Sequence, residues 1–133
     1  MNKLQSYGPL AIRIGVGILF LAAGLNKLSN PAGTAGFLNS LGFGAPVFWA
    51  WLLILSETIF GLLILIGYAV KVAAWPLIII MITATLKVVL PAFQSAASAP
   101  PTNILLHLLV ILSLLSLVFT GAGKLSLEKS KIE

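Results

Sequence analysis

Four long apolar runs divide the chain, and short polar or glycine- and proline-rich segments separate them. The runs lie near Pro9–Leu28, Val47–Gly67, Ala73–Leu90 and Asn103–Thr120. Each approaches the length of about 20 residues with which a helix crosses the hydrocarbon core of a bilayer. The runs lack the alternating polar pattern of a membrane barrel, and backbone amides in lipid must be satisfied within the segment. The pattern therefore predicts an all-α integral membrane protein with four spans.

The composition agrees with this class. The chain of 133 residues is 59% hydrophobic and 8% charged, and its mean hydropathy is +1.11. A soluble protein of this size could not cover so much apolar surface, so the expected environment is the lipid bilayer. The length predicts a single domain over residues 1–133. Because the chain has no cysteine, disulfides, thiol redox chemistry and thiolate metal sites are excluded.

The positions of the cations predict the orientation in the membrane. Cytoplasmic segments collect Lys and Arg. Five lysines fall on the two termini and on the short second connection, and these three regions share one side of a four-span topology: Lys3, Lys71, Lys124, Lys129 and Lys131. Both termini are therefore expected in the cytoplasm. The cations form no stripe with exposed aromatic residues, so a nucleic-acid partner is not indicated.

The segment Ser29–Pro46 between the first two spans has a pattern of its own. An Asn30-Pro31 start signal precedes Phe37, Leu38 and Leu41, which recur at helical spacing. We expect a short helix at the outer membrane interface. A second interpretation is that this helix covers a pocket.

The first span has one narrow face that combines glycines with cations. At about 100° per residue, the same face carries Arg13, Gly17, Phe20, Gly24 and Lys27. Glycines allow a neighbouring helix to approach closely, which turns this face toward the protein interior. The alternative is that the two cations extend to the opposite membrane interfaces.

Glu57 is the only acidic residue in the first 127 positions. It shares a helical face with Ala50, Gly61, Ile64 and Tyr68 in the second span. A carboxylate at this depth is costly unless it is paired. We expect a structural ion pair between Arg13 and Glu57 that fixes the register of the two helices, with a proton-accepting or ligand-binding role for Glu57 as the alternative.

A further set of polar residues falls in the outer third of the spans. The set comprises Lys27, Lys87, Asn103 and His107. Together with Glu57 below them, these residues predict a ligand-binding vestibule that suits an anionic oxygen or a quinone carbonyl. Each also has a structural explanation, such as a helix cap for Asn103, an extended side chain for Lys87 and a bond to a neighbouring helix for His107. One histidine without a second metal-type ligand makes no metal site, and no catalytic residue can be assigned.

Three motifs resemble the DoxX family of small membrane proteins. The first runs from Arg13 through Gly15, Gly17, Phe20, Ala23-Gly24 and Lys27-Leu28, the second is Glu57-x-x-x-Gly61, and the third is Gly121-Ala122-Gly123-x-x-Ser126-Leu127. The resemblance covers almost the whole chain. It implies an antiparallel four-helix bundle. Glu128 stands where the family pattern usually has Asp, and Lys87 and His107 match no family signature.

The family resemblance leaves two function classes. The family takes its name from a subunit associated with a terminal quinol oxidase and with thiosulfate:quinone oxidation. The first hypothesis is therefore an accessory or quinone-site subunit of a membrane redox system, with the core chemistry held by partner proteins. The expected partners are redox subunits or further copies of this chain. The second hypothesis is a small-molecule or lipid-binding bundle without redox chemistry. The sequence shows no intrinsic cofactor and no self-sufficient catalytic motif, and the expected ligand of the first hypothesis is a quinone.

Overall fold

A computed structural model describes residues 4–5, 7–91 and 102–126 of the chain. Every regular element in these residues is a helix, which confirms the all-α class. In chain order the elements are α1 (Tyr7–Leu28), α2 (Pro31–Ser40), α3 (Pro46–Ile66), α4 (Val70–Ala84), the π-helical turn η1 (Thr85–Val89) and α6 (Thr102–Thr120). The four apolar runs thus fold into α1, α3, α4 with η1, and α6, with ends close to those predicted.

Helices α1 and α3 pack against each other along a seam of small residues. A Cβ atom added at Gly17 would lie 2.9 Å from the backbone nitrogen of Leu65, and one added at Gly61 would lie 2.9 Å from the backbone nitrogen of Leu21. Gly24 lies in the same way against Thr58. These contacts leave no room for side chains, so the glycines allow the two backbones to touch. The predicted interior face of the first span is confirmed.

Helix α3 ends where the sequence demands a glycine. Gly67 has a φ of 79°, and the backbone N–H of Tyr68 donates to the carbonyl oxygen of Leu63 at 2.9 Å. A positive φ of this size suits glycine, and the bond pattern is that of a helix C-terminal cap. The turn that follows leads directly into α4, so α3 and α4 become neighbours.

Helix α4 contains two irregular features on the way to its C-terminal end. Pro76 lies inside the helix, and a proline there removes one backbone bond and favours a bend. Farther along, the hydroxyls of Thr83 and Thr85 donate to the carbonyl oxygens of Ile79 and Met81. Such bonds compete with the regular helical ladder, and the chain continues as the wider π turn η1.

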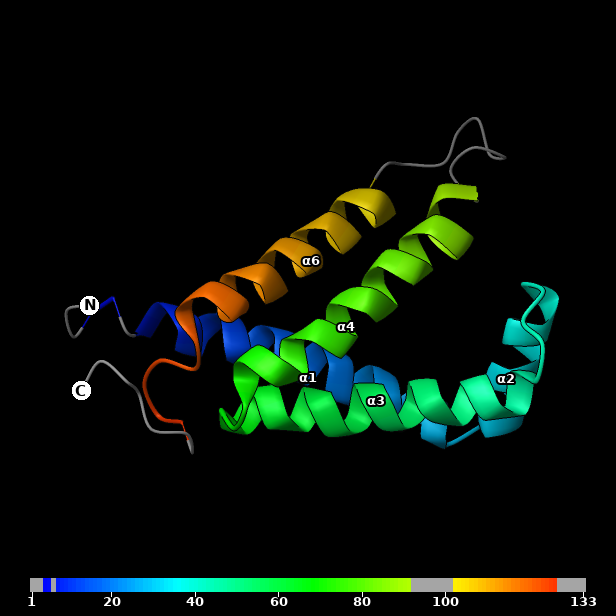
Figure 1. The fold of residues 1–133 in the computed structure, drawn as a ribbon, viewed down its shortest axis with the longest axis horizontal. Helices are drawn as coiled ribbons and strands as arrows, with labels where there is room; N and C mark the ends of the chain where they lie inside the picture. Colours follow the sequence, from blue (N-terminus) through cyan, green and yellow to red (C-terminus); the bar gives the residue numbers. More distant parts are fainter. Residues whose placement is uncertain (1–3, 6, 92–101, 127–133) are drawn as a thin grey trace.

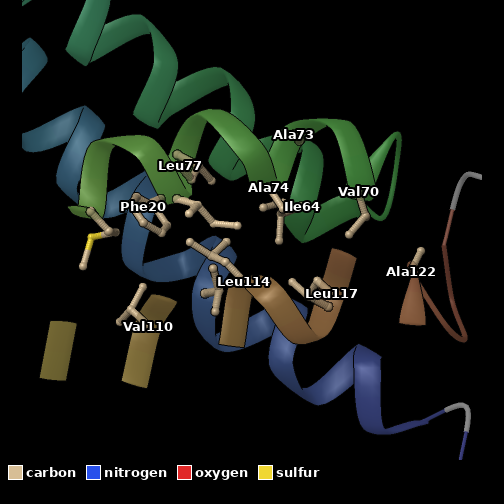
Figure 2. Close-up of a cluster of buried hydrophobic side chains, with 13 residues drawn as sticks. Phe20, Ile64, Val70, Ala73, Ala74, Leu77, Val110, Leu114, Leu117 and Ala122 are labelled. Atoms are coloured by element: carbon tan, nitrogen blue, oxygen red, sulfur yellow. The ribbon is translucent and has the colours of Figure 1, made fainter. Parts of the chain in front are cut away.

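The apolar core joins the four long helices at one end of the molecule. Figure 2 shows Phe20 of α1, Ile64 of α3, Leu77 of α4 and Leu114 of α6 within one buried cluster. Ala73 and Ala74 let α4 approach this cluster closely, and both are fully buried. The core therefore holds the helices together near the end of α3 and the start of α4.

Away from this core the helices separate into two pairs. Figure 1 shows α1 beside α3 and α4 beside α6, with the pairs diverging toward the end that carries α2. Helices α1, α3 and α4 with η1 are long and apolar enough to cross a membrane, and Ile104–Thr120 of α6 is a shorter apolar helix. Between the diverging pairs, side chains of α1, α2, α3, α4, η1 and α6 line a cavity.

Candidate functional site

A cavity of about 680 Å³ lies between the two helix pairs. Most of its lining is apolar. Helix α2 and its C-cap residue contribute Phe37, Leu38 and Leu41, helix α3 contributes Trp49, Leu52 and Leu53, and helix α4 contributes Pro76, Ile79 and Ile80. Cavities of this size and character are typical of sites for small organic ligands. The short helix α2 thus forms part of the cavity wall, as the second interpretation of Ser29–Pro46 expected.

The start of α2 is fixed by a side-chain cap. The side chain of Asn30 accepts a hydrogen bond from the backbone N–H of Gly33 at 3.0 Å, and Pro31 follows as the first helical residue. This is the start signal that the sequence predicted. It orients the short helix so that Leu38 is buried.

An ion pair between Lys27 and Glu57 lies in the wall of the cavity. The ammonium of Lys27 is 2.9 Å from Oε2 and 3.2 Å from Oε1 of Glu57. The Glu57 side chain is only 6% exposed, whereas Lys27 is 31% exposed. A carboxylate so deeply buried requires a cation beside it. Lys27, at the last turn of α1, supplies that cation.

The predicted pairing of Arg13 with Glu57 is therefore wrong. Since Gly24 lies against Thr58 and Gly17 against Leu65, the seam places Glu57 at the level of Leu25. Arg13 lies twelve residues earlier on α1, which is about 18 Å along a helix axis. No arginine side chain spans that distance. The sequence prediction estimated the depth of each residue in the membrane from separate apolar runs. Such an estimate does not give the register of α1 against α3.

Arg13 instead holds together the end of the molecule that carries the apolar core, away from the cavity. Its guanidinium is fully buried. Nε donates to the carbonyl oxygen of Ala122 at 2.7 Å, and Nη2 donates to those of Lys124 and Leu125 at 2.6 and 3.0 Å. Nη1 donates to the last turn of α3, at Ile64 and Leu65. Five donors thus meet five backbone carbonyls, and the segment after α6 is fixed against α1 and α3.

Lys87 and His107 line the same cavity as the ion pair. Lys87 lies on the π turn η1 and His107 on α6. The Nδ1 atom of His107 is 3.1 Å from the hydroxyl oxygen of Thr85. The structure therefore brings together four of the five predicted ligand-binding residues, from α1, α3, η1 and α6. Their role in binding stays a prediction.

For two residues near the site, the sequence prediction and the structure do not coincide. Asn103 lies in α6, but its side chain is outside the described part of the structure. Thr85 was not predicted, although it bonds His107. Its position two residues before Lys87 was the only sign in the sequence. That position indicates a place near the cavity only when the π turn is known. Within the described residues, no cluster of metal-ligating side chains occurs.

Comparison with known proteins identifies the family. The model of the DoxX family matches residues 8–90, which include α1, α2, α3 and α4. This chain belongs to the DoxX family. The match covers Arg13, Lys27, Glu57 and Lys87, whereas His107 lies beyond it. The resemblance found in the sequence motifs is confirmed.

Two relatives of this DoxX protein are named as membrane proteins and a third as an oxidoreductase. It is 31% identical to the protein named "Putative oxidoreductase CatD" of Bacillus subtilis, over 96% of this chain and 90% of the relative. It is 32% identical to the membrane protein Rv3486 of Mycobacterium tuberculosis, over 95% of this chain and 84% of the relative. It is also 39% identical to the inner membrane protein YqjF of Escherichia coli, over 56% of this chain and 55% of the relative. No solved structure matches this chain.

Proposed function

We propose that this DoxX protein is a quinone-site subunit of a membrane redox system, in which the cavity between the helix pairs holds the quinone. The observation that carries the proposal is the composition of the cavity wall. Apolar side chains surround most of the space, and Lys27, Glu57, Lys87 and His107 add polar groups from four elements. A quinone has an apolar ring and tail and two carbonyl oxygens, and such a ligand requires this combination. The oxidoreductase name of the Bacillus subtilis relative supports the redox setting.

The core electron transfer belongs to a partner in this proposal. The chain has no cysteine, and its described residues include no metal-ligating cluster. A second redox centre is needed to supply or remove the electrons of a quinone. The partner is a redox subunit. Further copies of this chain can join the same assembly around that subunit.

The proposal also includes an orientation in the membrane. Helix α6 forms the fourth span of an antiparallel bundle, α2 lies at the outer interface, and both termini lie in the cytoplasm. Lys71 in the first turn of α4 and Lys124 after α6 support this orientation. Both lie where α3 ends and α4 starts, since Arg13 bonds the carbonyl oxygens of Leu65 and Lys124 together. The cavity then opens in the outer half of the membrane, where quinones dissolved in lipid can enter between the diverging pairs.

Mass spectrometry of the gently solubilised protein tests the proposal. Quinone should co-purify with the wild-type protein, together with redox subunits. Lys87→Met and His107→Phe should each lower the retained quinone, counted as its oxidised and reduced forms together, at least severalfold while the helical circular dichroism signal stays unchanged. Wild-type levels of quinone in both folded variants would show that these residues are structural, and the quinone proposal would have to be dropped.

A lipid-binding function without redox chemistry is the second candidate. The largely apolar wall and the divergence of the helix pairs favour it, since an acyl chain needs little more than apolar contact. The same mass spectra separate the two functions. Retained phospholipid or fatty acid without quinone, kept by both variants, would support the second candidate.

A further inference from the structure

The contact between His107 and Thr85 determines more than the position of the imidazole ring. The hydroxyl of Thr85 donates to the carbonyl oxygen of Met81 at 2.8 Å, one helical turn earlier. The same oxygen is 3.1 Å from Nδ1 of His107. A hydroxyl has one hydrogen and two lone pairs, and a backbone carbonyl can only accept. The hydrogen is therefore committed to Met81, and the Thr85 oxygen accepts from Nδ1–H of His107.

This assignment fixes the tautomer of the neutral imidazole. When Nδ1 carries the hydrogen, Nε2 carries a lone pair and acts as a hydrogen-bond acceptor. No protein group in the described part of the chain bonds Nε2. Since His107 lines the cavity, Nε2 is the ring nitrogen left to meet a ligand.

The other polar groups in the wall determine which ligand head group suits this acceptor. Both carboxylate oxygens of Glu57 accept from Lys27, so that pair is largely satisfied within the protein. Lys87 is exposed and has no carboxylate beside it among the described residues.

The charged donor left for the head of a ligand is Lys87 and the imidazole acceptor is His107, beside the hydroxyls of Ser56 and Thr83 in the same wall. The Thr83 hydroxyl already donates to the carbonyl oxygen of Ile79. A ligand hydroxyl satisfies both Lys87 and His107, because its oxygen accepts and its hydrogen donates.

Resting on the proposed function, we propose that Thr85 is a positioning residue that holds His107 as an acceptor, so that the cavity prefers a quinol to the corresponding quinone. The hydroxyl hydrogen of a quinol can bond Nε2, whereas a quinone carbonyl would bring a second lone pair toward it. When two acceptors face each other with no hydrogen between them, neither is satisfied and the affinity for the ligand falls. One such bond corresponds to about a tenfold preference.

The single histidine of the chain permits a direct test of the tautomer. Protein labelled with ¹⁵N-histidine gives one pair of imidazole nitrogen signals, recorded in mildly alkaline buffer without ligand. The wild-type protein should show a protonated Nδ1 and an unprotonated Nε2. Thr85→Val should lose this tautomer preference and Thr85→Ser should keep it. A protonated Nε2 in the wild-type protein would overturn the proposal whatever the ligand does.

Binding measurements test the preference itself. Under anaerobic conditions, a short-chain quinol should bind the detergent-solubilised protein about tenfold more tightly than its quinone. His107→Phe and Thr85→Val should reduce this ratio to about one, and Thr85→Ser should restore it. Thr120→Val is the matched control, since the Thr120 hydroxyl also bonds a carbonyl one turn earlier but does not bond His107.

The outcomes separate this inference from the function on which it rests. Binding of neither form would refute the proposed function and the preference with it. Equal binding of both forms by the wild-type protein, with the same ratio in Thr85→Val, would refute the preference alone and leave the quinone site in place.

Discussion

At the scale of single residues, Arg13 and Glu57 show how two buried charges in one bundle are satisfied in different ways. Glu57 has a side-chain partner, Lys27. Arg13 bonds, among its contacts, backbone carbonyls at the ends of segments, where these groups lack helical partners. The sequence identified both charges as interior, because the cost of burial and the glycines beside them indicate it. Their partners depend on helix register and on backbone carbonyls, which have no residue-type signal.

Replacing Arg13 tests its role as a link between segments. Arg13→Lys keeps the charge but provides at most three donors from one nitrogen. Several of the five carbonyl bonds are then lost, and the free energy of unfolding should fall by about 3 kcal/mol. Thermal unfolding in detergent measures this loss. A Lys variant with wild-type stability would contradict the five-bond arrangement.

The Lys27–Glu57 pair should appear as a coupling between mutations. Lys27→Met leaves a buried carboxylate alone and should cost about 3–5 kcal/mol, whereas the double variant with Glu57→Gln should cost less than the two single changes together. The control cycle combines Glu57→Gln with Arg13→Lys, whose effects should add. Additive effects for Lys27 and Glu57, or strong coupling in the control cycle, would contradict the observed pairing.

At the scale of elements, the apolar periodicity was sufficient to locate the long helices and the interior face of α1. The length and hydropathy of an apolar run are strong signals for a membrane helix, and glycines on one face indicate where a neighbouring helix packs closely. The π turn η1 was not predicted, because apolar periodicity carries no signal for a single wider turn within a long apolar helix. The predicted place of α2 at the membrane interface stays a prediction.

The seam between α1 and α3 gives a prediction with a control on the same helix. Gly17→Ala would place its Cβ 2.9 Å from the backbone of Leu65 and should lower the free energy of unfolding by about 1–3 kcal/mol. Gly15 is exposed and has no atom within 4 Å of an added Cβ, so Gly15→Ala should be neutral or stabilising. Thermal unfolding compares the two, and equal effects would show that the helices do not touch at Gly17.

At the scale of the whole molecule, the proposed orientation can be tested by cysteine labelling, which the cysteine-free chain makes simple. Ser40 and Lys71 are both exposed and lie at opposite ends of α3. In intact cells, a membrane-impermeant maleimide should label Ser40→Cys and should reach Lys71→Cys only after permeabilisation. The reverse pattern would invert the topology.

The central claim is that the space between the diverging helix pairs binds a quinone, and filling that space tests it most directly. Ala84 lines the cavity, whereas Ala22 lies exposed on α1 and outside the cavity wall. Titration with a short-chain quinone should give an affinity at least about tenfold weaker for Ala84→Phe than for the wild-type protein, because the added ring occupies the site. Ala22→Phe should bind as the wild-type protein does. An unchanged affinity in a folded Ala84→Phe variant would contradict the claim.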